Sequence, residues 1–323
     1  MPRQARLDTP GALHHIMVRG INKLAIFGDE ADKSRFLERL GSCVVNGGCT
    51  VYAWVLMDNH VHVLFRSGKD GISSVMRRLL TWYAQYYNRR HNRSGHLFEN
   101  RYKSVLCDEE NYLLALVRYI HLNPVRANMV HTIEELGHYR WSGHRAVLGK
   151  ARYPWMAVNE VLDRFGGTGR QSVAGYRRFV AEGMQMEHDP TMSGGGLVRS
   201  LGGWSQVIAA RRKGNRDASD ERILGNGDFV EAVLRETEER QLRQMKHRLS
   251  GLTIADIIGE ECKKAGIGRV EVTSGARRAL VSRTRALIAC RSRDELGLSA
   301  AEIARHLGVA TSAVTRAIGR VEK

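Results

Sequence analysis

Apolar and polar positions repeat with two different periods along the N-terminal part of the chain. Runs rich in β-branched and aromatic residues predict strands over 12–18, 50–57, 60–65 and 102–106. Apolar residues at helical spacing predict helices over 29–45, 72–90 and 109–122. Pro124 ends the last of these, because the residue before a proline disfavours helical geometry.

The order of these elements is strand, helix, strand, strand, helix, strand. This is the order of a ferredoxin-like, split βαβ antiparallel sheet, so we predict an α+β fold for residues 1–150. Glycine clusters with weak periodicity predict a connector with short helices over 151–225. Helical patterns dominate residues 226–323, which predicts an all-α domain ending in a helix-turn-helix at about 298–320, with Gly308 at the turn.

Composition narrows the class of protein. The chain has 323 residues, 50 of them Lys or Arg against 34 Asp or Glu, and a net charge of +16, which favours nucleic acid partners over a merely basic enzyme. The five cysteines are scattered and predict neither a disulfide framework nor a thiolate zinc site. No apolar run is long enough for a bilayer, so we expect no membrane association and a cytoplasmic protein.

His60, Val61 and His62 form the sharpest chemical pattern. The two-residue period of a strand places both imidazoles on one face and Val61 on the other. Two neighbouring imidazoles can bind one cation. Taken alone, the pair is also compatible with ordinary surface or core histidines.

Tyr119 lies near the end of the helix predicted over 109–122, and Asn123 follows four residues later. At that spacing a phenol and a carboxamide project from the same side of a helix. The pair could supply a nucleophile and a metal ligand. Burial in an amphipathic core is the alternative reading of Tyr119.

Three segments, 54–62, 95–103 and 119–125, together resemble the repeat-associated tyrosine transposases of the His-hydrophobic-His (HUH) class in order and spacing. The resemblance implies that His60, His62 and Asn123 hold Mg²⁺ or Mn²⁺, although related enzymes can have Gln in place of Asn123. It implies that Tyr119 attacks single-stranded or hairpin DNA and forms a 5′-phosphotyrosine. The bound cation, Arg118 or His121 could help the phenol lose its proton.

Basic residues near these motifs are candidates for holding DNA phosphates, with a solvated basic surface as the alternative. They are Arg19, Arg77, Arg78, Arg101, Lys103 and Arg126. Aromatic residues on the helix over 72–90 could stack on bases, although packing against the sheet accounts for most of them.

The C-terminal segment over 250–321 resembles the DNA-binding domain of the bacterial replication initiator. That family has an Asp-His-Thr-Thr signature where this chain has residues 310–313, Ala-Thr-Ser-Ala, so the target sequence does not carry over. If the segment is a helix-turn-helix rather than an ordinary helix pair, the residues facing duplex DNA are Thr311, Ser312, Thr315 and Arg316.

The leading functional hypothesis is therefore a strand-transferring transposase, which the resemblance implies to be nucleoid-associated and able to form a homodimer. Two alternatives remain at this stage. A non-catalytic DNA-binding regulator could keep the same fold, and an HUH nicking initiator could use the same chemistry for replication or plasmid transfer. The retention of His60, His62 and Tyr119 counts against the regulator.

Overall fold

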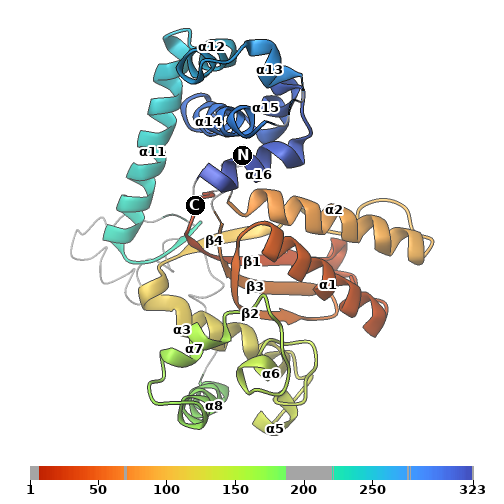
Figure 1. Ribbon diagram of the computed structural model, residues 1–323. Coiled ribbons are helices and arrows are strands. Elements are labelled where there is room, and N and C mark those ends of the chain that lie inside the picture. Colours follow the sequence, from red (N-terminus) through yellow and green to blue (C-terminus); the bar gives the residue numbers. More distant parts are fainter. Residues whose placement is uncertain are drawn as a thin grey trace. The chain divides into compact units, whose positions relative to one another are not determined.

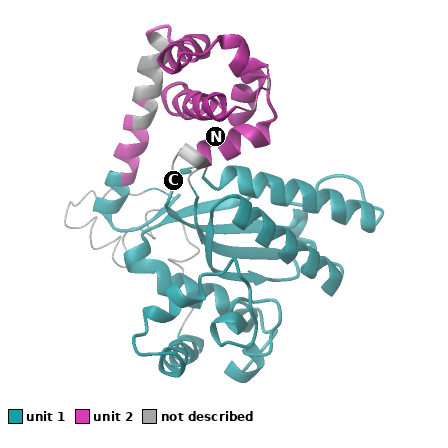
Figure 2. Cartoon of the chain, viewed as in Figure 1, with its two compact units in different colours: residues 1–232 teal, residues 233–323 magenta. Residues whose placement is uncertain are grey.

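In a computed structural model of the protein, the structure describes residues 7–68, 71–186, 220, 222–274, 276 and 278–321. The chain divides into two compact units, Met1–Ala232 and Val233–Lys323 (Figure 2). The domain boundaries predicted at residues 150 and 225 remain predictions. None of the helices in the described ranges combines the length and apolar character that a bilayer-spanning segment needs.

Unit 1 contains the predicted ferredoxin-like sheet. Its strands pair in the order β2-β3-β1-β4-β5, and the three pairings among the first four strands are antiparallel. The short β5 (Ile223–Leu224) adds a parallel edge beside β4 that the sequence did not predict. The other elements, in chain order, are β1 (Leu13–Arg19), α1 (Glu30–Asn46), β2 (Thr50–Leu56), β3 (His60–Arg66), α2 (Ser73–Arg90), β4 (Lys103–Cys107) and α3 (Glu109–His121). The predicted α+β fold is confirmed.

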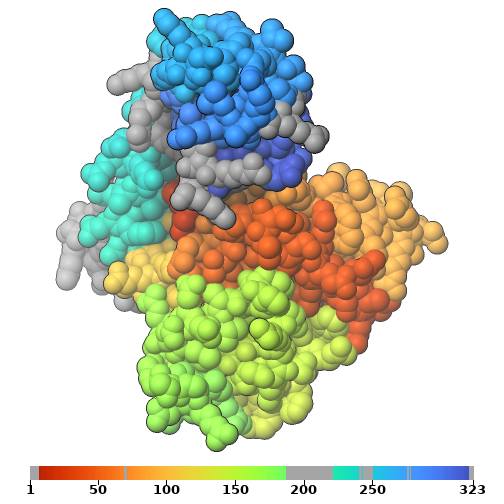
Figure 3. Space-filling view, viewed as in Figure 1, coloured from red at the N-terminus to blue at the C-terminus, as the bar shows by residue number. Residues whose placement is uncertain are grey.

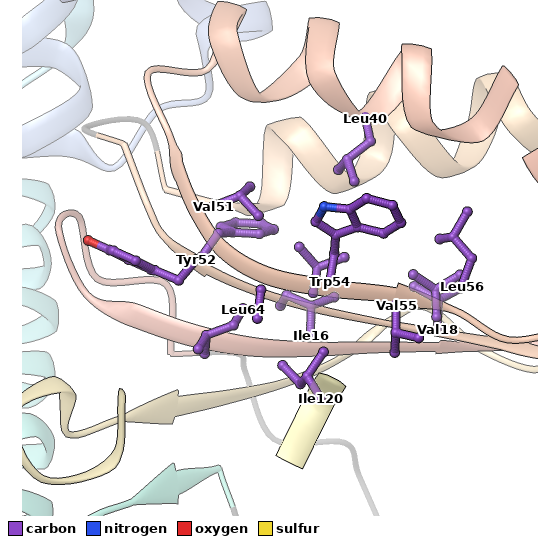
Figure 4. Close-up of a cluster of buried hydrophobic side chains, with 14 of the residues drawn as sticks. Ile16, Val18, Leu40, Val51, Tyr52, Trp54, Val55, Leu56, Leu64 and Ile120 are labelled. Atoms are coloured by element: carbon purple, nitrogen blue, oxygen red, sulfur yellow. The ribbon is translucent and has the colours of Figure 1, made fainter. Parts of the chain in front are cut away.

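Helices cover both faces of the sheet. In Figure 1, α1 and α2 lie on the same face. In Figure 4, Leu40 of α1 and the Trp54 ring lie on one side of the strands and Ile120 of α3 on the other. All three side chains are fully buried. The sheet is therefore the middle layer, with α1 and α2 packed on one face and α3 on the other.

The chain after α3 also belongs to unit 1. It forms α4 (Asn123–Arg126), α5 (Ile133–Leu136), α6 (His144–Val147), α7 (Val158–Asp163) and α8 (Arg170–Met184). Val161, Tyr176 and Val180 are fully buried in the same core as the sheet. The green surface in Figure 3 shows that the chain from α5 to α8 forms one continuous part of this unit. The stretch 187–219 of the predicted connector lies outside the described residues.

Unit 2 is helical throughout its described residues. After α11 (Gly227–Leu249), which begins in unit 1, come α12 (Ile254–Ala265), α13 (Arg269–Thr273), α14 (Ala279–Leu296), α15 (Ala300–Leu307) and α16 (Thr311–Val321). Ser299 and Glu302 form a capping box that begins α15. Gly308 ends it at φ 61°, where an added Cβ would lie 2.4 Å from the carbonyl oxygen of Thr273. The two helices span the predicted segment, and its role as a helix-turn-helix stays a prediction.

Replacing Ile16 by Ala should destabilise unit 1. Ile16 is fully buried on the central strand β1, so the substitution should lower the free energy of unfolding by about 2–5 kcal/mol. Tryptophan fluorescence during urea unfolding measures this, because the sequence has no tryptophan after residue 232. Leu24→Ala, at a side chain that is 54% exposed, is the control and should change stability by less than about 0.5 kcal/mol. Equal effects of the two substitutions would contradict the assigned core.

Candidate functional site

Strand pairing determines which side chains share a face with His60 and His62. In the antiparallel register, Met17 pairs with His62 and Arg19 pairs with His60. Lys103 of β4 pairs with Met17 from the other side. Directly paired residues project to the same face, so Arg19, Lys103 and both histidines share one face of the sheet. The helix α3 packs against β2 and β3 on this face.

Tyr119 lies against this histidine face. It projects from the last turn of α3 and is only 7% exposed. The centre of its ring lies 6.1 Å from that of His62 and 5.8 Å from that of His15, edge-on in both cases. The structure thus brings together the histidines and the tyrosine that the sequence singled out, although 57 positions separate His62 from Tyr119 in the sequence.

Asn59 determines which ring nitrogen of His60 carries the proton. The Oδ1 atom of Asn59 lies 2.6 Å from Nδ1 of His60, and its Nδ2 donates to the carbonyl of Lys23. An oxygen can only accept, so Nδ1 of His60 carries the proton and Nε2 keeps an electron pair. Burial and the positive charge of Arg19 lower the pKa of His60, which keeps the ring neutral at pH 7.

His62 is more deeply buried, at 6% exposure, and its Nδ1 lies 2.9 Å from Nε2 of His15. Its pKa is held well below the usual value, first by burial and then by the charges that His15, His60 and Arg126 would present. The rings of His60 and His62 are 5.1 Å apart between centres. Two neutral imidazoles on one face are the form of histidine that a cation requires.

Asn123 is the predicted third ligand. The described ranges contain no group of three histidine, cysteine or acidic side chains arranged to bind a metal ion. Asn123 begins α4, and its Nδ2 donates to the carbonyls of Tyr119 and Ile120. Pro124 has no N–H to offer the Ile120 carbonyl, so the Asn123 side chain supplies one. Both of these hydrogen bonds use Nδ2, so the amide oxygen of Asn123 can serve as a ligand, and such an oxygen suits Mg²⁺ or Mn²⁺. These ligand types suit a divalent cation, and His60, His62 and Asn123 as its ligands stay predictions.

Arg126 contacts Tyr119 directly, which the sequence did not predict. Its guanidinium carbon lies 4.6 Å from the centre of the phenol ring, and Nη1 donates to the Tyr119 carbonyl at 3.2 Å. The side chain therefore occupies the face of the candidate nucleophile.

The two residues that we expected to assist Tyr119 contact other groups. Arg118 lies over the ring of Phe179, 4.1 Å from its centre. His121 is fully buried and its Nδ1 lies 2.7 Å from the hydroxyl of Tyr176. The described geometry thus favours Arg126 over Arg118 and His121 as the basic neighbour of the phenol.

A buried hub connects the end of α3 to α6 and α8. The hydroxyl of Tyr176 lies between Nδ1 of His121 and Nδ1 of His144, at 2.7 and 2.6 Å. The hydroxyl can donate to one ring and accept from the other when the two imidazoles have different tautomers. Burial lowers the pKa of His144 to about 3 and holds that of His121 well below its usual value. The hub fixes the helix that carries Tyr119.

The remaining predicted DNA contacts fall into three places. Arg77 and Arg78 are exposed on α2, which covers the sheet face opposite Tyr119. Arg101 is exposed just before β4. Thr311, Ser312, Thr315 and Arg316 lie on α16 in unit 2, and all but the half-buried Thr315 are exposed. Only Arg19, Lys103 and Arg126 are brought to the histidine face or to Tyr119.

Asn59 and His15 were missed as partners of the two histidines. Asn59 follows Asp58, and this pair is typical of a turn, so the sequence carries no separate signal for its contact with His60. For His15 a signal existed, because the two-residue period puts either His14 or His15 on the face of His62. Register alone decides which of the two it is.

Residues 10–123, about a third of the chain, match the family model described as "Transposase IS200 like". The predicted resemblance to tyrosine transposases is confirmed over this segment. The chain is also similar to a solved REP-associated tyrosine transposase bound to a REP hairpin, with 16% identity, a TM-score of 0.39, and coverage of 48% of this chain and 89% of that chain. No curated protein matches the chain. The resemblance of unit 2 to the replication initiator stays a prediction.

Lower pH should destabilise unit 1 through the buried hub. Its histidines are neutral when folded, so below pH ~6.5 the unfolded chain binds more protons, and stability falls by up to about 1.4 kcal/mol per pH unit for each histidine. His144→Asn removes one titrating ring, and it should flatten the dependence of the unfolding free energy between pH 6.5 and 4. Tyr176→Phe keeps both rings, so it should lower stability by about 1–3 kcal/mol and retain the slope. An unchanged slope in His144→Asn would contradict this assignment.

Proposed function

We propose that this chain, whose residues 10–123 match the IS200-like transposases, is a metal-dependent enzyme that cleaves and rejoins single-stranded DNA. The observation that carries the proposal is the position of Tyr119 beside His62, at 6.1 Å between ring centres, on a face where both strand histidines are neutral. The proposed nucleophile and the two proposed cation ligands are therefore neighbours in a site that is largely shielded from solvent.

In the proposed reaction, the phenol oxygen of Tyr119 attacks the phosphorus of a phosphodiester. A bond forms between that oxygen and the 5′-phosphate, the bond to the 3′-oxygen breaks, and the proton lost by the phenol ends on the free 3′-hydroxyl. The 5′-phosphotyrosine conserves the energy of the broken bond. A 3′-hydroxyl can therefore reverse the attack and join strands without ATP.

His60, His62 and Asn123 are the proposed ligands of Mg²⁺ or Mn²⁺. When bound, the cation neutralises charge on the non-bridging oxygens of the phosphate and aligns the scissile bond. Arg126, over the ring of Tyr119, is placed to stabilise the phenolate as it forms. Arg19 and Lys103, exposed on the same face, are the proposed contacts to neighbouring phosphates.

Single-stranded or hairpin DNA is the proposed substrate. Tyr119, in the last turn of α3, is 7% exposed, so the DNA backbone must come close to the protein surface to bring a scissile phosphate to the phenol oxygen. A flexible single strand can follow such a surface more easily than a rigid duplex. The net charge of +16 supports attraction of DNA in general.

Unit 2 is the proposed duplex-binding part. Ser299 caps α15, Gly308 makes the turn, and α16 presents Thr311, Ser312 and Arg316 as exposed residues. A helix that begins after such a turn can enter the major groove of DNA. We further propose that the protein acts as a homodimer at the nucleoid in the cytoplasm, as the resemblance implies.

The central test is the covalent intermediate. The protein is incubated with labelled single-stranded hairpins from the DNA that flanks its gene, with and without Mn²⁺, and adducts are resolved on a denaturing gel. We expect a metal-dependent adduct that Tyr119→Phe abolishes and that His62→Ala reduces at least about 100-fold. Tyr112→Phe is the matched control, since it removes a half-buried phenol on the same helix, and it should keep the adduct.

Two outcomes would contradict the proposal. Tight hairpin binding without an adduct in any divalent metal would indicate a DNA-binding regulator that has lost catalysis. An adduct that survives in Tyr119→Phe would place the nucleophile elsewhere. Cleavage confined to an origin of replication or transfer would instead favour a nicking initiator.

Duplex binding by unit 2 has its own test. Arg316→Ala should weaken binding of the full-length protein to target duplex by about 1–3 kcal/mol and reduce its salt dependence, because it removes an exposed cation from α16. Fluorescence anisotropy at several salt concentrations measures both quantities. Lys263→Ala removes an exposed cation from α12 and should leave affinity within about twofold. Equal losses in both variants would indicate binding by net charge alone.

A further inference from the structure

His15 lies between the candidate metal ligand and the candidate nucleophile. It is on the central strand β1, is 1% exposed, and projects to the same sheet face as His62. Its ring stacks on that of His62, with centres 5.1 Å apart and planes 28° apart. The ring of Tyr119 meets His15 edge-on at 5.8 Å. One side chain thus contacts both groups of the proposed site.

The hydrogen bond between the two histidines has one proton. Nε2 of His15 and Nδ1 of His62 are 2.9 Å apart, which is a hydrogen-bond distance. A neutral imidazole has one N–H and one bare nitrogen. If His15 donates, Nε2 of His62 must carry its own proton and cannot bind a cation. If His15 accepts, Nε2 of His62 keeps its electron pair.

We propose that His15 is a positioning residue that accepts the Nδ1–H of His62, fixes that tautomer, and presents Nε2 of His62 to the divalent cation. The inference rests on the proposed function, and it deepens it by assigning the residue that prepares one ligand. Asn59 has the corresponding place at His60, where its oxygen accepts from Nδ1. Outer partners of this kind orient metal-binding histidines in general.

A purely structural role does not account for this contact equally well. Burial of an imidazole carries a desolvation cost that an aromatic hydrocarbon would avoid at the same volume. His14, the preceding residue, is also fully buried, but it projects to the opposite face and its Nδ1 lies 3.2 Å from the hydroxyl of Ser104. The two neighbours form a natural pair of test and control, with similar burial and different partners.

The test measures Mn²⁺ binding by calorimetry on the full-length protein without DNA. His15→Phe keeps an aromatic ring against His62 and removes the acceptor, so Mn²⁺ should bind about 10–100-fold more weakly. His15→Gln places an amide oxygen near the former Nε2 position and should restore binding to within about threefold. His14→Phe should also stay within about threefold of the unaltered protein.

Unchanged affinity in His15→Phe would overturn the inference and leave the proposed site intact. Binding that His62→Ala does not weaken would overturn the proposed site itself, and the inference with it. The two failures are therefore distinguishable.

A second measurement needs no variant at position 15. In protein labelled with ¹⁵N-histidine and free of metal, the His62 signals, assigned by their loss in His62→Gln, should show the proton on Nδ1 and a bare Nε2. Addition of Mn²⁺ should broaden the Nε2 signal first. A proton on Nε2 of His62 would overturn the inference.

Discussion

The two-residue period of β3 is the constraint on which the site depends. Val61, Val63 and Phe65 are buried on the sheet face covered by α1 and α2, so His60 and His62 must project to the other face, toward α3. A shift of one residue in pairing would exchange the faces and expose the apolar set. The hydrophobic core therefore fixes the orientation of both imidazoles before any ligand is present.

Burial then determines the chemistry of this face. His62 and Tyr119 are buried where α3 packs against the sheet, and this burial favours the neutral form of the His62 imidazole over the charged one. Electrostatic interactions are also stronger where water is excluded. A site of this kind can hold a divalent cation with neutral ligands, which leaves the positive charge of that cation available to a phosphate. Arg126 adds a second positive charge at the phenol.

Much of unit 1 could be predicted from the sequence, because its strands and helices carry strong local periods and its element order matches a known arrangement. The predicted bounds of α1, α2 and the first four strands differ from those observed by a residue or so. Contacts between residues far apart in the sequence leave no such periodic pattern. The edge strand β5 joins β4 after more than a hundred residues, and the partners of His121 come from α6 and α8. Arg126 reaches Tyr119 across the break between α3 and α4 at Leu122, which periodicity does not describe.

Tyr119 is the residue proposed to join to DNA, and mass spectrometry of the covalent product tests this most directly. The adduct is digested with a nuclease and a protease, and the modified peptide is sequenced by fragmentation. We expect one nucleotide attached through its 5′-phosphate to Tyr119. Attachment to another residue, or through a 3′-phosphate, would contradict it.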